Sequence, residues 1–122
     1  MATDIKVELS EEFAVRIVGC YRYLCSDKAE YVMSKQLLRA GTSIGANISE
    51  ALFSESDSDF IHKLTIAQKE ASETRYWIRL LNKTDYLSNE LADSLNEDCT
   101  RILKVLTSII KSMKAKENAF NP

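Results

Sequence analysis

Side chains of the types that catalyse reactions or hold metal ions are few in this sequence. The single histidine is His62, and the residue three positions before it is Asp59, so no Glu-x-x-His pair exists. Because a di-metal site in a helical bundle needs such pairs on two helices, Glu70 and Glu73 alone do not make one. A cysteine or serine nucleophile would need a neighbouring base, and only His62 could serve. We therefore expect no enzyme activity, no catalytic residue, no metal and no cofactor, with His62 at the surface or at a helix contact.

The three cysteines, Cys20, Cys25 and Cys99, are odd in number and match no zinc-binding spacing. All three fall in segments with helical periodicity, so we expect buried, reduced thiols. Residues 1–10 lack the basic start and apolar run of a signal peptide. No apolar stretch approaches the roughly 20 residues that span a membrane. These features predict a cytoplasmic protein without membrane contact.

A polar stripe follows one side of the segment 33–53, at steps of four, four and three residues: Arg39, Ser43, Asn47 and Glu50. If this segment and the next form a helical hairpin that turns near Glu55, Arg39 lies across from about position 72. Arg39 would then reach two carboxylates, and the same register places Glu50 near His62. We predict a structural hydrogen-bond network between two helices, in preference to a solvated face or a catalytic site, and breaking it would cost about 3 kcal/mol. The network comprises Arg39, Ser43, Asn47, Glu50, Glu70 and Glu73.

Two segments are locally basic, although the whole chain has a net charge of −2 and a pI of about 5.5. Lysine and arginine clusters are the usual footprint of nucleic-acid binding. Cations near helix C-termini also offset the helix dipole, so both interpretations stay open. The candidate nucleic-acid contacts are Arg75, Arg79, Lys83, Arg101, Lys104, Lys111, Lys114 and Lys116.

Four helical segments separated by short polar breaks would position these residues. The first is predicted to begin at Ser10 as its N-cap, and the second between residues 30 and 34. The third follows the polar break 54–59 and ends near Lys83, and Ser88 caps the fourth. Short connections favour antiparallel neighbours, so we predict an all-α, antiparallel up-down-up-down four-helix bundle. It forms a single domain over residues 1–122, with a polar N-terminal lead (1–9) and a frayed tail (115–122).

The third segment carries a second stripe beside its seam, although a bundle helix needs only one apolar face inside a monomer. This stripe consists of Ile66, Glu70, Glu73, Trp77 and Leu80, and Tyr76 lies next to it. Its core seam has heptad spacing and consists of Phe60, Leu64, Ala67, Ala71, Thr74, Ile78 and Leu81. In the second stripe, Trp77 either covers the edge of the core or anchors a subunit interface, where tryptophan and tyrosine are enriched. The candidate oligomer interface consists of Ile66, Tyr76, Trp77 and Leu80.

Two glycines, Gly41 and Gly45, lie in the middle of the second predicted helix. Each should cost about 1 kcal/mol relative to alanine in a helix interior. Their spacing of four residues puts them on one face of the helix, where two positions without side chains let another helix come close. The pair therefore predicts a close helix–helix contact.

The block from Gln36 to Ala51, QLLRAGTSIGANISEA, resembles the signature of the bacterial four-helix-bundle family named after 23S ribosomal RNA intervening sequences. A second block, Phe60–Leu64 with Ala67–Trp77, is similar to one branch of that family. Other branches carry Gly-Ser where this chain has Lys69-Glu70. The resemblance spans nearly the whole chain.

This resemblance implies an up-down bundle that assembles into a ring-like homo-pentamer. Some members are encoded within ribosomal RNA insertions. The similar accessory variability proteins of diversity-generating retroelements act with a reverse transcriptase and nucleic acid, using a basic surface, from which this slightly acidic chain departs. We expect a non-enzymatic homo-oligomeric helical-bundle scaffold whose further partner is nucleic acid or a nucleic-acid enzyme. A protein–protein adaptor with no nucleic-acid role is the alternative.

Overall fold

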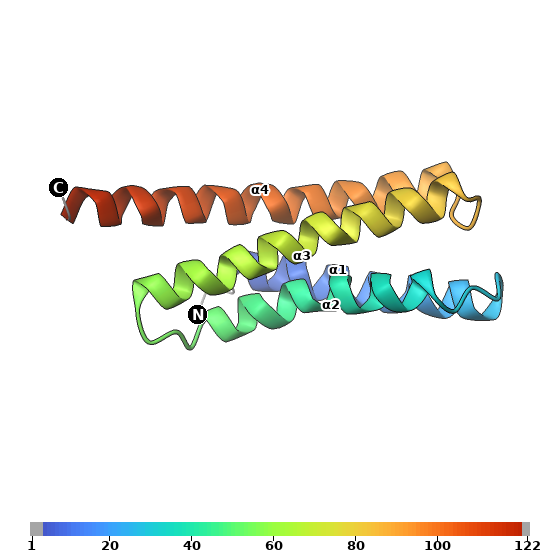
Figure 1. The fold of residues 1–122 in the computed structure, drawn as a ribbon, viewed down its shortest axis with the longest axis horizontal. Helices are drawn as coiled ribbons and strands as arrows, with labels where there is room; N and C mark the ends of the chain where they lie inside the picture. Colours follow the sequence, from blue (N-terminus) through green and yellow to red (C-terminus); the bar gives the residue numbers. More distant parts are fainter. Residues whose placement is uncertain (1–3, 121–122) are drawn as a thin grey trace.

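The computed structural model describes residues 4–120, which form four α-helices (Figure 1). The helices are α1 (Ile5–Ser26), α2 (Met33–Ala51), α3 (Asp57–Lys83) and α4 (Asn89–Phe120). Each helix packs against the next in sequence, and α1 also packs against α4, so the four helices surround one core in up-down-up-down order. The predicted all-α four-helix bundle is confirmed. In Figure 1 the C-terminal turns of α4 extend beyond the α2–α3 connection.

The prediction that Ser10 caps the first helix is wrong, because α1 begins at Ile5. Asp4 is the N-cap, and its Oδ1 accepts the Lys6 N–H at 3.0 Å. Ser10 is buried within the helix and donates its hydroxyl to the Val7 carbonyl at 3.0 Å. Both residues are capping types, and the structure selects the earlier one because the first two turns pack on the bundle. Of the predicted lead, residues 5–9 are therefore helical and residues 1–3 lie outside the described residues.

The other helix starts follow two different capping arrangements. Ser56 caps α3 by accepting the Asp59 N–H at 3.0 Å, and Ser88 accepts the Leu91 N–H at 3.2 Å, as predicted for the fourth helix. The N-cap position of α2, Val32, has no capping side chain, and the buried Glu30 carboxylate supplies the acceptors instead. At its C-terminal end, α4 continues to Phe120, so residues 115–120 of the predicted frayed tail are helical. Residues 121–122 lie outside the described part.

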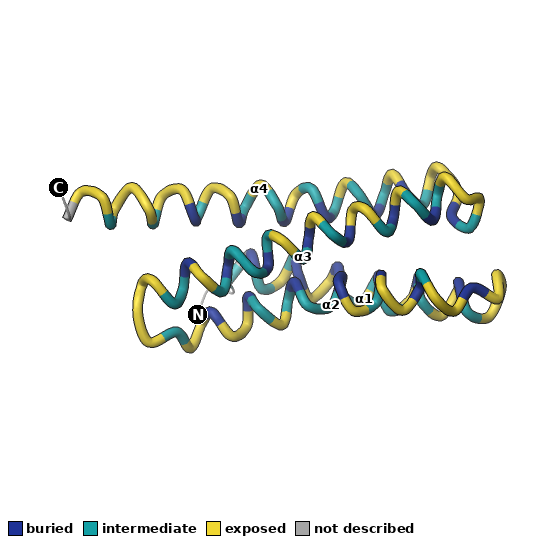
Figure 2. The backbone as a smooth tube through the Cα atoms, viewed as in Figure 1, coloured by how far each residue is buried: buried dark blue, intermediate teal, exposed yellow. Residues whose placement is uncertain are grey.

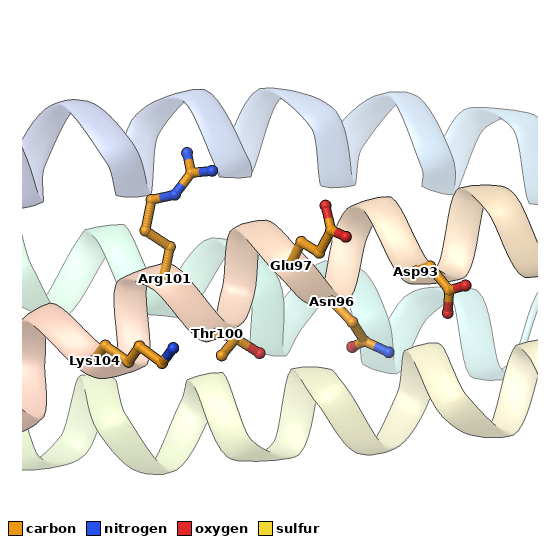
Figure 3. Close-up of a pocket in the computed structure, with 6 residues that line it drawn as sticks. All are labelled: Asp93, Asn96, Glu97, Thr100, Arg101 and Lys104. Atoms are coloured by element: carbon orange, nitrogen blue, oxygen red, sulfur yellow. The ribbon is translucent and has the colours of Figure 1, made fainter.

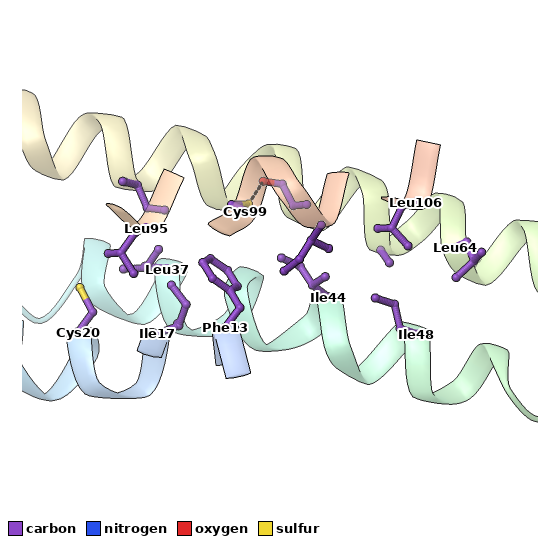
Figure 4. Packing of buried hydrophobic residues seen from close by; sticks show 14 of the residues in the cluster. Phe13, Ile17, Cys20, Leu37, Ile44, Ile48, Leu64, Leu95, Cys99 and Leu106 are labelled. Atoms are coloured by element: carbon purple, nitrogen blue, oxygen red, sulfur yellow. Dashed lines mark hydrogen bonds between the residues drawn. The ribbon is translucent and has the colours of Figure 1, made fainter. Parts of the chain in front are cut away.

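The core lies along the axis of the bundle, where buried positions recur on the inward side of each helix (Figure 2). Figure 4 shows side chains from all four helices meeting there, with the Cys99 thiol donating to the Ala71 carbonyl at 3.3 Å. The predicted seam of α3 is buried except for Phe60, which is partly buried. On α4, Ala92 and Ile110 are buried, and their neighbours Leu91 and Ile109 are partly buried against the core.

The predicted close helix contact lies between α1 and α2. A Cβ atom added to Gly41 would lie 2.8 Å from Ile17 Cγ2, and one added to Gly45 would lie 3.3 Å from Ser10 Oγ. At Gly19, on the exposed side of α1, a Cβ would meet nothing within 4 Å. The two α2 glycines therefore permit the approach of α1, and the contact is tightest at Gly41.

None of the helices in residues 4–120 combines the length and the apolar character that a membrane span requires.

Candidate functional site

An ion-pair cluster joins α2 to α3 on the outside of the bundle. The Arg39 guanidinium donates from Nη1 to Glu70 Oε2 at 3.3 Å, and from Nη2 to Glu73 Oε2. Gln36 Oε1 accepts a longer bond from Arg39 Nε at 3.4 Å. The cluster fixes the register between two helices that are consecutive in the sequence.

The rest of the predicted polar stripe does not join this cluster. The Ser43 hydroxyl donates to the Arg39 carbonyl at 2.6 Å, and the Asn47 amide donates to the Ser43 carbonyl at 2.8 Å. Glu50 instead accepts a hydrogen bond from Lys63 Nζ at 3.1 Å. Serine and asparagine inside a helix readily bond to carbonyls one turn back, so these two side chains are satisfied locally. The structure therefore brings together Arg39 and the two carboxylates of α3, and leaves the other three residues outside.

The Arg39–Glu73 pair should contribute less than a buried pair would, because 48% of the Arg39 side chain and 41% of the Glu73 side chain are exposed. We expect Arg39→Ala and Glu73→Ala each to lower the free energy of unfolding by about 1 kcal/mol or less, with a coupling of about 0.5 kcal/mol in the double mutant. Urea unfolding at about 0.1 M salt should show the coupling, and about 1 M salt should weaken it. Arg79→Ala combined with Glu73→Ala is the control pair and should be additive. A coupling that salt leaves unchanged, or none at low salt, would contradict the assignment.

An aromatic pair marks the outer face of α3. The rings of Tyr76 and Trp77 meet edge to face, with centroids 5.0 Å apart and an interplanar angle of 74°. Trp77 packs against the core, whereas 46% of Tyr76 is exposed. Within residues 4–120, Trp77 Nε1 is buried without a hydrogen-bond partner. The α3 strip, defined as Ile66, Tyr76, Trp77 and Leu80, thus covers the core edge with one aromatic ring and presents the other to solvent.

The eight basic candidates are all exposed. Three of them, Arg75 from α3 and Lys104 and Lys111 from α4, meet in one groove of about 470 Å³ between these helices. We call it the α3–α4 groove, and it is lined by Arg75, Thr100, Leu103, Lys104, Thr107, Ser108 and Lys111. No carboxylate is among these lining residues. The remaining five candidates, Arg79, Lys83, Arg101, Lys114 and Lys116, lie outside this groove.

A second hollow, of about 510 Å³, runs along α4 and has mixed charge. In Figure 3, Asp93 and Glu97 stand toward one end of the row of lining residues, and Arg101 and Lys104 stand at the other. Opposite charges one or two turns apart on a helix can offset each other, so this hollow has no strong preference for an anion or a cation.

An arginine clamp between α1 and α4 has no counterpart in the sequence analysis. Arg16 donates from Nη1 to Asp98 Oδ2 at 2.6 Å, and from Nη2 to the Ser94 hydroxyl at 3.0 Å. The same Nη1 is 3.4 Å from the Ser94 carbonyl oxygen. The clamp ties the first helix to the last. Charge alternation could have suggested a partner for Arg16, but the register between α1 and α4 cannot be counted from any shared turn.

Two of the three cysteines, Cys20 and Cys99, are buried, and Cys25 is partly exposed. Burial raises the pKa of the Cys20 thiol to about 11 and that of Cys99 to about 12. Because the thiolate is the reactive form, both buried thiols are poor nucleophiles at neutral pH. His62 is exposed, and in the part of the chain that the structure describes no three His, Cys, Asp or Glu side chains are grouped to hold a metal ion.

Comparison with known proteins identifies the family. The family model described as 23S rRNA-intervening sequence protein matches residues 5–108. A crystal structure from Bacteroides thetaiotaomicron, of a protein with unknown function from the S23 ribosomal protein family, is 56% identical and superposes with a TM-score of 0.86. The match covers 87% of this chain and 98% of that one. No curated protein matches. The chain belongs to the 23S rRNA-intervening sequence protein family.

Proposed function

We propose that the protein is a non-enzymatic scaffold whose copies assemble into a homo-oligomer through the outer face of α3. The observation that carries this proposal is the Tyr76–Trp77 pair, which lies outside the core seam and leaves 46% of Tyr76 in solvent. Aromatic side chains of this kind are enriched at protein interfaces and often supply most of the binding energy. The family resemblance supports a ring of five subunits. Localisation in the cytoplasm is part of the same proposal.

Three ionisable groups with shifted pKa values have structural roles. A general acid or base works best with a pKa near the operating pH. The pKa values of Cys20 and Cys99 are raised far above neutrality by burial, and that of Glu30 is lowered below its ordinary value. These groups serve the core and the start of α2.

Two other functions are distinguished by what the protein binds. An adaptor would use the α3 strip for a different protein and would remain monomeric alone. Nucleic-acid binding is favoured only by the three cations of the α3–α4 groove. It predicts an affinity that falls steeply with salt: for each phosphate contacted, the logarithm of the binding constant falls by about 0.7 to 0.9 for every tenfold rise in salt concentration. Fluorescence anisotropy with a labelled oligonucleotide over a salt series tests this alternative.

The scaffold proposal predicts a different result for two tyrosine substitutions. We expect Tyr76→Arg to remain folded but to lose the oligomer, because an arginine would place an unpaired charge in the interface. Tyr31→Arg is the matched control, since Tyr31 is also exposed but lies in the α1–α2 connection. Circular dichroism checks the fold, and sedimentation velocity measures assembly. If Tyr76→Arg keeps the mass of the wild-type oligomer, the α3 strip is not the interface.

A further inference from the structure

The outer face of α1 carries an acidic patch with an exposed apolar residue. Glu8, Glu11, Glu12 and Val15 line one shallow hollow, and Val15 is 68% exposed. Elsewhere on the bundle, carboxylates such as Asp98 and Glu70 pair with arginines. Within residues 4–120, by contrast, none of the three patch glutamates forms an ion pair. This patch, Glu8 to Val15, is the acidic face of α1.

The α3–α4 groove has the complementary composition. Arg75, Lys104 and Lys111 supply three cations, and no ion pair within the described range 4–120 includes any of them. Leu103, which is partly buried against the core, supplies an apolar element, and hydroxyl groups complete the lining. The groove can therefore accept carboxylates around a small apolar side chain.

The two surfaces also match in length. Lys104 and Lys111 are seven residues apart on α4, and Glu8 and Val15 are seven residues apart on α1. Seven residues of helix span about 10 Å, so the two surfaces have the same overall length, of which the carboxylates from Glu8 to Glu12 occupy about 6 Å and Val15 the remaining end. A helix that lies along a groove between two other helices is an ordinary packing arrangement.

The two surfaces cannot meet within one molecule. α1 lies beside α2 and α4 and diagonally across the core from α3, so its outer face lies on the far side of the bundle from the α3–α4 groove. We propose that the acidic face of α1 on one copy docks into the α3–α4 groove of the next copy. This inference rests on the proposed homo-oligomer and names its contact. Two different patches on each subunit make a head-to-tail contact, which closes into a ring when the rotation between subunits permits.

The contact adjoins the aromatic strip already proposed for assembly, because Tyr76 follows Arg75 directly on α3. A nucleic-acid strand would also bring negative charge to the groove. However, the chain has a net charge of −2 and carries its own complementary surface, which favours a second copy as the occupant. Charge complementarity of this kind sets orientation and suppresses wrong pairings.

Charge reversal tests the contact. We expect the groove variant Arg75→Glu/Lys104→Glu and the face variant Glu8→Lys/Glu12→Lys each to remain folded but to sediment as monomers of 13.8 kDa. An equimolar mixture should recover alternating oligomers, because the reversed groove pairs with the reversed face and the two unchanged surfaces also pair. Strict alternation cannot close a ring of five, so the mixture should sediment faster than either variant alone without reproducing the wild-type mass. Lys28→Glu/Lys35→Glu is the control, because it reverses the charge of two exposed cations that do not line the groove. It should assemble like the wild type. About 1 M salt should weaken the wild-type contact.

Three results would overturn the docking. One is assembly of both folded variants at the wild-type mass, which would leave the scaffold proposal intact but place its contact elsewhere. Another is failure of the mixture to recover an oligomer. The third is a groove variant that loses binding to a labelled single-stranded RNA while it keeps the wild-type oligomer, which would make the groove a nucleic-acid site. A wild-type protein that is monomeric throughout would defeat the proposed function itself.

Discussion

Replacing Gly41 with alanine is expected to destabilise the bundle by about 1–3 kcal/mol, even though alanine is the better helix former. The added Cβ would lie 2.8 Å from Ile17 Cγ2 and 2.9 Å from Ile17 Cγ1. Carbon atoms pack favourably at about 3.5–4.0 Å, so the Ile17 side chain or one of the two helices has to shift. Ile17 is fully buried in the core cluster, so either shift would disturb the packing around it.

Urea unfolding of three alanine variants measures this effect. Gly19→Ala is the matched control, because its Cβ meets nothing within 4 Å, and it should gain up to about 1 kcal/mol. Gly45→Ala should fall between the two, since its nearest contact, Ser10 Oγ, is 3.3 Å away. In an Ile17→Ala background the penalty at Gly41 should disappear. A Gly41→Ala protein that is stabilised as much as Gly19→Ala would show that α1 and α2 are not in close contact.

Replacing Glu30 with glutamine is expected to lower the free energy of unfolding by about 2 kcal/mol at neutral pH. Glu30 is buried, with only 7% of the residue exposed. Its Oε1 accepts the N–H groups of Val32 at 3.1 Å and Met33 at 2.9 Å, and its Oε2 accepts that of Ser34 at 2.7 Å. A glutamine keeps only one acceptor oxygen and would turn an amide donor toward a backbone donor. At least one N–H at the start of α2 would then be buried without a partner.

The effect of this substitution should depend on pH in a defined direction. Burial raises the pKa of Glu30, but the hydrogen bonds from Met33, Ser34 and Val32 outweigh it and hold the pKa below the ordinary 4.5. Because the folded-state pKa is the lower one, the carboxylate stabilises fully above about pH 4.5 and loses its contribution as the pH falls through the folded-state pKa.

Urea unfolding at pH 7 and at about pH 3 should therefore show a smaller difference between wild type and Glu30→Gln in acid. Glu90→Gln is the control, since Glu90 is an exposed carboxylate in the first turn of α4. It should change stability by no more than about 0.5 kcal/mol at either pH. A Glu30→Gln difference that is the same at both pH values would refute the capping role.

The parts of the structure that follow from the sequence are those set by local pattern. The apolar periodicity of α2 and α3 predicts both helices, and their short connection lets the register be counted, so Arg39 could be placed opposite Glu70 and Glu73. The glycine pair predicts a close contact because two positions without side chains share a face. In each case the relevant residues lie on one helix or on two consecutive ones.

The features that the sequence could not predict depend on tertiary structure. Arg16 meets Asp98 across 82 positions of the chain, and no turn fixes the register of α1 against α4. Asp4 and Ser10 are both suitable caps, and only packing of the first two turns decides between them. Glu30 caps α2 although it precedes the N-cap residue, Val32. Ala29, directly before Glu30, has a left-handed φ of 51°, which a non-glycine residue seldom takes.

Light scattering of the purified wild-type protein at micromolar concentration tests the central claim most directly, because it measures assembly without any substitution. The scaffold proposal predicts a single species of about five times 13.8 kDa, the mass of the five-subunit ring that the family resemblance implies. A mass of 13.8 kDa at every concentration would contradict assembly and the interfaces proposed for it.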